Sequence, residues 1–158
     1  MGPLVSEEQL GRVAGYVESG KKEGAKVLAG GERPEGLKGF FLKPTVFTDV
    51  KDSMRIAREE IFGPVAAVLS FESAEDVLQR ANATPYGPAA GVWTKDVKKA
   101  FRMAQGLRAG TVWINAYNVT DTTSPWGGFK ESGWGREAGS EAIRLYTEVK
   151  TVWVDLNG

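Results

Sequence analysis

The chain has 158 residues, and its 20 basic and 20 acidic side chains give a formal net charge of zero. That balance provides no electrostatic footprint for nucleic acid or an acidic membrane, and the length fits one domain. The sequence contains neither Cys nor His, which excludes disulfides, a cysteine nucleophile within these residues, histidine-dependent triads and the commonest metal ligands. We see no apolar run of the roughly 18 residues that a membrane span needs and no signal-peptide pattern, so the cytoplasm is the expected compartment.

The N-terminal part of the chain predicts one long helix followed by short extended segments. Ser6 opens a capping-box pattern, and apolar residues then recur with helical spacing, which predicts a helix over Glu7–Glu23 that Gly24 closes. A short strand is expected at Lys26–Ala29. The stretch Phe40–Phe47 reads as extended and irregular, because a proline interrupts it.

Strands and helices alternate in the middle of the chain. Three strands are expected, at Val65–Phe71, Ala89–Thr94 and Thr111–Ile114, and the first is apolar enough to be covered on both faces. Ser73 and Asp96 are the expected N-caps of the two intervening helices. This alternation implies parallel strands joined by right-handed crossovers.

The C-terminal part has a different texture. Asn115–Arg136 is rich in Gly, Pro and aromatic residues and has little periodicity, which predicts a long functional or packed loop. A short helix over Glu137–Leu145 and a final strand over Tyr146–Asp155 are expected next. The predicted fold class is therefore α/β, with a small, mainly parallel sheet, crossover helices, a long loop and a C-terminal strand.

Four motifs, in order and at characteristic spacing, resemble the C-terminal third of the NAD(P)-dependent aldehyde dehydrogenase superfamily. They are Glu59–Val65, Asn82–Asp96, Gly110–Asn115 and Ser124–Gly133 with its continuation to Lys150. The likeness covers essentially the whole chain, and Pro88 is its one clear departure, at a position where the family usually has Leu. The resemblance implies that 1–136 is a partial catalytic domain, that 137–158 is a C-terminal helix with an oligomerisation strand, and that the cofactor domain and nucleophilic Cys lie upstream in a longer protein.

The same resemblance implies roles for four side chains. Glu60 would bind the hydroxyls of the nicotinamide ribose, and Phe62 would pack near that ribose. Thr120 and Trp126 would line the substrate tunnel, while the Tyr146–Asp155 strand would pair with a neighbouring subunit of a homo-oligomer. In the complete enzyme a cysteine thiolate attacks the aldehyde and hydride passes to NAD or NADP. We expect no catalytic residue, metal or bound cofactor in this chain alone, and therefore no turnover.

Blander interpretations remain open for these residues. Glu60 could be an ordinary surface carboxylate and Phe62 a core residue. Trp126 could form a cation–π wall for an amino aldehyde or a plain apolar wall. The glycine-rich stretch Gly127–Gly135 is no phosphate-binding loop, because Trp134 stands where that motif requires Lys.

Two rival functions also remain. In the first, the chain is one subunit of a split aldehyde dehydrogenase, and another polypeptide supplies the Cys and the cofactor domain. In the second, it is a non-catalytic interaction module that uses the strand Tyr146–Asp155 to pair with another chain, since an unpaired strand edge is a template for such pairing.

Overall fold

In the computed structural model, which describes all 158 residues, helix α1 spans Glu7–Lys22. Its N-cap is Ser6, whose side-chain oxygen accepts a hydrogen bond from the Gln9 N–H at 3.1 Å. Gly24 follows the helix with a φ of 93°, a conformation that glycine adopts without a steric penalty. The capping pattern and the terminating glycine therefore act as the sequence predicts.

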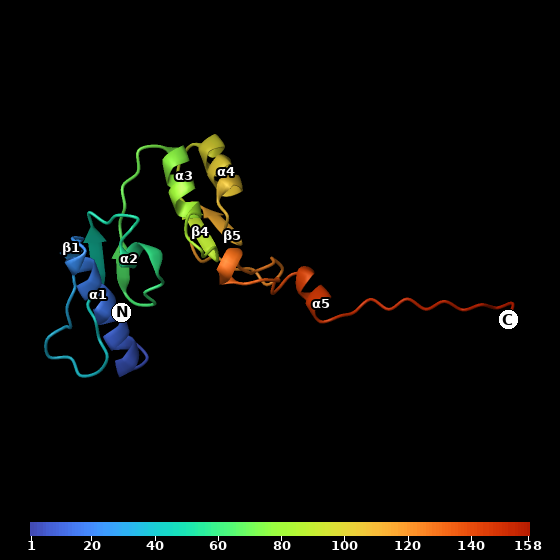
Figure 1. Ribbon diagram of the computed structural model, residues 1–158, viewed down its shortest axis with the longest axis horizontal. Helices are drawn as coiled ribbons and strands as arrows, with labels where there is room; N and C mark the ends of the chain where they lie inside the picture. Colours follow the sequence, from blue (N-terminus) through green and yellow to red (C-terminus); the bar gives the residue numbers. More distant parts are fainter. The chain divides into compact units, whose positions relative to one another are not determined.

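By its internal contacts the chain divides into two units, residues 1–71 and 72–158. In the first unit, α1 packs with a three-stranded sheet in the order β1-β2-β3 and with one short helix (Figure 1). The further elements are β1 (Lys26–Ala29), β2 (Thr45–Thr48), α2 (Arg55–Arg58) and β3 (Val65–Ala67). The pair β1–β2 is antiparallel and β2–β3 is parallel. Val13 and Phe47, each with an exposed fraction of 0%, lie at the centre of the core.

The second unit contains one parallel strand pair with a helix in the crossover. Its elements are α3 (Ala74–Asn82), β4 (Ala89–Val92), α4 (Val97–Gly106) and β5 (Thr111–Ile114). Ser73 caps α3 by accepting from the Asp76 N–H at 3.1 Å, and Asp96 caps α4 by accepting from two N–H groups, as predicted. In the chain, α4 comes between β4 and β5, and these two strands pair in parallel. The expected strand–helix–strand crossover is therefore confirmed for this pair.

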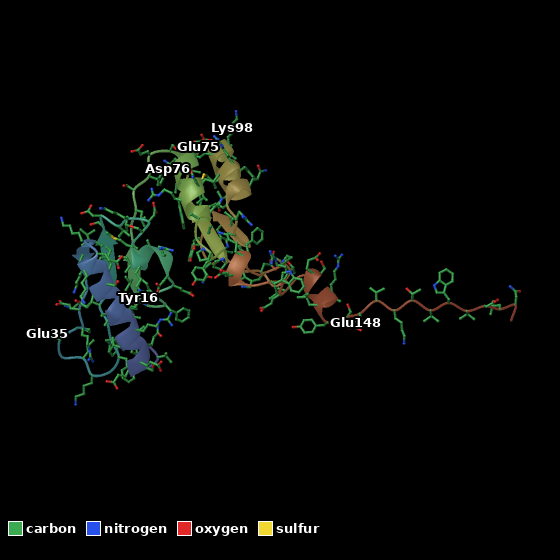
Figure 2. The ribbon with its side chains drawn as sticks, in the orientation of Figure 1. Tyr16, Glu35, Glu75, Asp76, Lys98 and Glu148 are labelled. Carbon is green, nitrogen blue, oxygen red and sulfur yellow. The ribbon has the colours of Figure 1, made fainter.

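The long loop after β5 contains one 3-10 turn, η1 (Lys130–Ser132), and an isolated antiparallel bridge between Trp126 and Glu137. The helix expected over Glu137–Leu145 begins later, as α5 (Glu141–Leu145). The segment 146–158 then runs extended and exposed, with Glu148 near its start (Figure 2).

One sequence prediction about strands needs correction, and one stays a prediction. Tyr146–Asp155 pairs with no other strand of the chain, and its expected pairing with a neighbouring subunit stays a prediction. The stretch Val65–Phe71 forms only the short strand β3, which pairs with β2 rather than with β4. None of its three residues is fully buried, so it is not covered on both faces.

Helix α2 was not predicted from the sequence, in which Arg55–Arg58 belongs to a run of mixed charge; the burial of Ile56 accounts for it. Two of the three strand pairings are parallel, so the α/β class with a mainly parallel sheet is confirmed. The functional boundary between residues 136 and 137 stays a prediction. None of the helices has the length and apolar character to cross a membrane.

Candidate functional site

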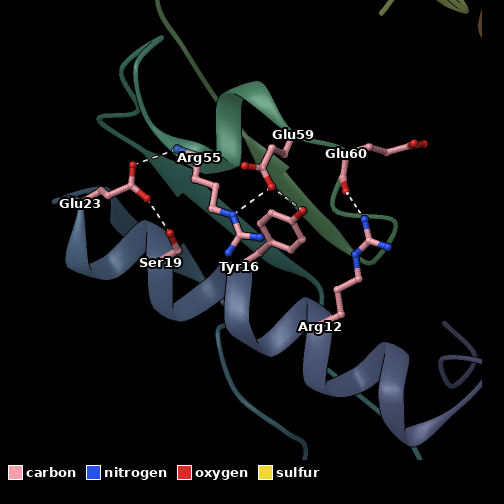
Figure 3. Close-up of polar contacts among 7 residues, drawn as sticks. All are labelled: Arg12, Tyr16, Ser19, Glu23, Arg55, Glu59 and Glu60. Atoms are coloured by element: carbon pink, nitrogen blue, oxygen red, sulfur yellow. Dashed lines mark hydrogen bonds and ion pairs between the residues drawn. The ribbon is translucent and has the colours of Figure 1, made fainter. Parts of the chain in front are cut away.

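The segment after α2 carries Glu60, one of the two residues that the sequence assigned to a cofactor. Its carbonyl oxygen accepts a hydrogen bond from Arg12 Nη2 at 3.4 Å, whereas its side chain points away from α1 (Figure 3). The residue is exposed, and its carboxylate makes no hydrogen bond or ion pair within the chain. Two free carboxylate oxygens suit a pair of adjacent hydroxyl groups, so the donor set of a ribose fits this group.

Phe62, two residues further on, is held by its backbone while its ring is left in solvent. Its carbonyl accepts from Gln9 Nε2 at 2.8 Å, and its side chain is 73% exposed. The alternative that Phe62 is a core residue is therefore wrong for this chain. Its φ of 56° lies in the left-handed region, which costs a non-glycine residue roughly 1–2 kcal/mol and persists only when surrounding contacts hold it.

A cluster around the Glu59 carboxylate fixes the start of this segment. The Tyr16 hydroxyl and Arg55 Nε both donate to Glu59 Oε2, each at 2.9 Å, and the Arg55 guanidinium lies 4.3 Å from the centre of the Tyr16 ring. The Tyr16 hydrogen bond, and after it the Arg55 hydrogen bond, lowers the pKa of Glu59 below its ordinary value of 4.5. At neutral pH Glu59 is thus ionised and joins α1 to α2.

The second unit brings together the two residues assigned to the substrate. Thr120 and Trp126 both line a pocket of about 380 Å³, together with Val119, Pro125 and Asp121 among others. That volume is within the range of small-molecule sites, and the wall combines apolar and hydroxyl groups. Asp121 accepts from the Thr123 N–H and hydroxyl at 2.8 and 2.7 Å.

These two hydrogen bonds have an electrostatic consequence for the pocket. The Thr123 backbone N–H, and after it the Thr123 hydroxyl, lowers the pKa of Asp121 below its usual range. The pocket therefore carries a negative charge at neutral pH. A negative charge in the same pocket as Trp126 is compatible with either interpretation of that ring, cation–π or apolar.

Trp126 is held in the pocket wall by its backbone and by a neighbouring ring. Its N–H donates to the Glu137 carbonyl at 2.7 Å, and the Glu137 N–H returns a bond of 2.6 Å. The Trp113 ring lies 6.0 Å from the Trp126 ring, and Trp113 Nε1 donates to the Val119 carbonyl at 2.8 Å. Trp113 thus supports the pocket from strand β5, a role that its place in a predicted strand did not reveal.

Two further residues that sequence reasoning missed anchor the loop. The Asn115 side-chain amide accepts from the Thr94 N–H and donates to the Thr94 carbonyl, both at 2.9 Å. Lys130 Nζ donates to the carbonyls of Asn82 and Thr84 at 3.1 and 2.8 Å. Asn115 and Lys130 have φ values of 53° and 56°. Asn is the non-glycine residue that best tolerates such a φ, so Asn115 directly after a strand was the available signal.

Known proteins resemble this chain along nearly its whole length. The sequence model described as "Aldehyde dehydrogenase family" matches residues 1–152. Human aldehyde dehydrogenase 1A1 is 53% identical over 156 residues, which are 99% of this chain and 31% of that protein.

Solved structures give the same result. A structure described as the NAD+ complex of an aldehyde dehydrogenase from Bacillus cereus is 60% identical and superposes with a TM-score of 0.95, over 99% of this chain and 32% of that one. The aldehyde dehydrogenase of Mycobacterium tuberculosis, also described as complexed with NAD+, is 48% identical with a TM-score of 0.94, over 100% and 33%. The chain therefore spans about a third of the length of its relatives.

Proposed function

Because this chain belongs to the aldehyde dehydrogenase family, we propose that it is one part of an enzyme that oxidises an aldehyde to a carboxylate with NAD(P)+. Its contribution is a carboxylate for the nicotinamide ribose and one wall of the substrate pocket. When bound, NAD(P)+ supplies the hydride acceptor for the oxidation. NAD+ is the first cofactor to test, since the two structures compared above are NAD+ complexes.

The observation that carries this proposal is the Glu60 carboxylate, which is exposed, has no partner within the chain and stands on a segment held by helix α1. A carboxylate accepts from two ribose hydroxyls at once and so sets the angle of the attached ring. Phe62, with its ring in solvent two residues away, would pack against the same ribose.

The Thr120 and Trp126 pocket is proposed to receive the aldehyde. Its apolar wall suits the carbon skeleton of a substrate, and the ionised Asp121 favours a substrate with a positive charge remote from the carbonyl. A kinetic comparison of an amino aldehyde with an uncharged aldehyde of equal length tests this preference. If Trp126→Leu changes kcat/KM for the two aldehydes by the same factor, the cation–π interpretation is wrong and the ring is an apolar wall.

The chemical step needs a thiolate, and these 158 residues contain no Cys. The nucleophile must therefore come from polypeptide outside them, either upstream in the same protein or in a second subunit. The pure 158-residue chain, assayed with NAD+ or NADP+ and several aldehydes, should give no NAD(P)H. Production above the background of a heat-treated sample would contradict the proposal.

A split enzyme is tested by reassembly. Mixing this chain with a polypeptide that carries the cysteine and the cofactor domain should restore NAD(P)H production if the two are natural partners. Glu60→Gln should then lower kcat/KM for NAD+ by about ten-fold, as expected for a weakened hydrogen bond to a charged acceptor. Glu35→Gln, at another exposed glutamate of the first unit, is the matched control and should leave the kinetics unchanged.

Pairing between copies of the enzyme is proposed to use Tyr146–Asp155. The side chains of Val149, Val152 and Trp153 are 101%, 72% and 92% exposed. Pairing with another strand would cover part of this exposed apolar surface. Light scattering of Val152→Pro, with Val152→Ala as control, tests this. Only proline removes the backbone N–H, so a multimer that persists unchanged in the proline variant rules this strand out as the interface. The cytoplasmic location expected from the sequence stays a prediction, which cell fractionation would test.

A further inference from the structure

One face of helix α1 makes a regular series of polar contacts with the segment that carries Glu60. Positions 9, 12, 16 and 19 of α1 and its C-cap at 23 recur at spacings of three and four, so their side chains lie on one side of the helix. Three of them bind the segment directly, because Gln9 contacts the Phe62 carbonyl, Arg12 the Glu60 carbonyl and Tyr16 the Glu59 carboxylate. The order along the helix is the reverse of the order along the segment.

The series continues to the start of α2. Glu23 accepts from the Ser19 hydroxyl at 2.6 Å through one carboxylate oxygen and from the Arg55 N–H at 2.9 Å through the other. Figure 3 shows these contacts in sequence along α1, from Arg12 at one end to Glu23 at the other. From Arg55 to Phe62, the segment is therefore hydrogen-bonded to the same helix face at four positions.

These polar contacts differ in kind from those that stabilise the unit. The core is supplied by apolar side chains such as Phe47, Ile56 and Ile61, which are 0%, 4% and 8% exposed. The contacts of Gln9 and Arg12 are exposed to solvent, so each adds little to stability. Burial of Ile61 anchors the segment, and the contacts of Gln9 and Arg12 are made at the carbonyls of its two exposed neighbours, Phe62 and Glu60.

We propose that Gln9, Arg12 and Tyr16 are positioning residues, which set the direction of the Glu60 carboxylate and the left-handed turn at Phe62. They do so by holding the Phe62 carbonyl, the Glu60 carbonyl and the Glu59 carboxylate, respectively. This inference rests on the proposed role of Glu60 at the nicotinamide ribose. A ribose contact depends on the angle at which the carboxylate leaves the chain, because misplacement by about 1 Å is enough to lower activity by two orders of magnitude. The helix face therefore determines cofactor geometry without touching the cofactor.

The test compares three single-group changes in the 158-residue chain. Tyr16→Phe removes the hydroxyl that holds Glu59 and keeps the ring under Arg55. Gln9→Leu removes the donor to Phe62 and keeps a helix-forming side chain. Glu18→Gln, at an exposed ion pair with Lys21 on the same helix, is the matched control.

The first readout is backbone mobility, measured as the ¹H–¹⁵N heteronuclear NOE at Glu59 to Gly63. We expect it to fall in Tyr16→Phe and Gln9→Leu and to stay at the wild-type value in Glu18→Gln. The NOE across β4 and β5 should not change in any variant. Wild-type NOE values at Glu60 and Phe62 in either of the first two variants would overturn the inference, whatever the kinetics.

The second readout is steady-state kinetics of the active enzyme that contains this chain. Tyr16→Phe should raise KM for NAD+ about five-fold, the factor that corresponds to one ordinary hydrogen bond, and leave KM for the aldehyde unchanged. A general loss of structure would instead lower the active fraction and leave both KM values as they are. If Glu60→Gln leaves the NAD+ kinetics unchanged while Tyr16→Phe still loosens the segment, the ribose role of Glu60 fails and the positioning of the segment stands.

Discussion

Replacing Lys130 with Met removes one ammonium group and keeps a long, unbranched side chain in its place. The ammonium donates to the carbonyls of Asn82 and Thr84 at 3.1 and 2.8 Å, and these bonds join the end of α3 to the loop that lines the pocket of Thr120 and Trp126. The φ of 56° at this position disfavours Lys and Met alike. Backbone strain therefore cancels in the comparison, and the loss of the ammonium remains.

The loss in the free energy of unfolding caused by Lys130→Met follows from the two hydrogen bonds and from the burial of the residue. A hydrogen bond that involves a charged group contributes about 1.5–3 kcal/mol. Lys130 is only half-buried, so water can solvate part of what the ammonium leaves behind. We expect the free energy of unfolding of the second unit to fall by about 2 kcal/mol, and its melting temperature by about 10 °C.

Tryptophan fluorescence during urea unfolding measures this change in the second unit alone, because all 5 tryptophans lie beyond residue 71. Lys95→Met, at an exposed lysine of the same unit, controls for the loss of one positive charge. If Lys130→Met and Lys95→Met unfold at the same urea concentration, the bonds of Lys130 contribute nothing to the anchoring of the loop, and our account of the pocket wall is wrong.

Three further changes have defined outcomes. In Gly110→Ala the new Cβ would overlap the backbone carbonyl of Gly127, so the second unit should lose about 3 kcal/mol or more in the same fluorescence assay; an unchanged midpoint would contradict the packing described. Gly15→Ala, with open space at its Cβ in the middle of α1, should stabilise the first unit by roughly 0.5–1 kcal/mol, measured by far-ultraviolet circular dichroism, and a loss of stability would refute this. Tyr16 and Arg55 lower the pKa of Glu59. The contribution of the Glu59 carboxylate to folding stability is therefore present above its ordinary pKa of 4.5 and is lost as the pH falls through the lower pKa of the folded state. Carbon-detected NMR titration of Glu59 should therefore give a lower midpoint in the wild type than in Tyr16→Phe, and equal midpoints would contradict the hydrogen bond.

Local signals in the sequence predicted most of the secondary structure. Ser6, Ser73 and Asp96 cap helices where their spacing indicated, because an N-cap needs only a short polar side chain and the N–H groups that follow it. Helix α2 was not predicted, because Ile56 is its single buried residue and two of its four residues are charged. Four residues are too few for a periodic pattern to emerge.

The candidate site was predictable as residue types but not as a geometry. The motifs pointed to Glu60 and Phe62, yet the contacts that hold them come from α1, and Gln9 and Phe62 stand 53 positions apart along the chain. Lys130 likewise acts through carbonyls 46 and 48 positions away. The sequence around Gln9 or Lys130 does not indicate these distant carbonyl partners, because a surface lysine or glutamine without such a partner has the same kind of local sequence.

By itself, the sequence determined the helix caps, the mainly parallel α/β class, the family and the absence of a thiol within these residues. Each of these depends on residue identity or on spacing over a few positions. Tertiary structure alone decided that β3 pairs with β2, that Phe62 stays in solvent, and that one face of α1 holds the segment bearing Glu60. Strand pairing and long-range hydrogen bonds are choices among many partners of similar chemistry, and only packing of the whole unit selects one of them.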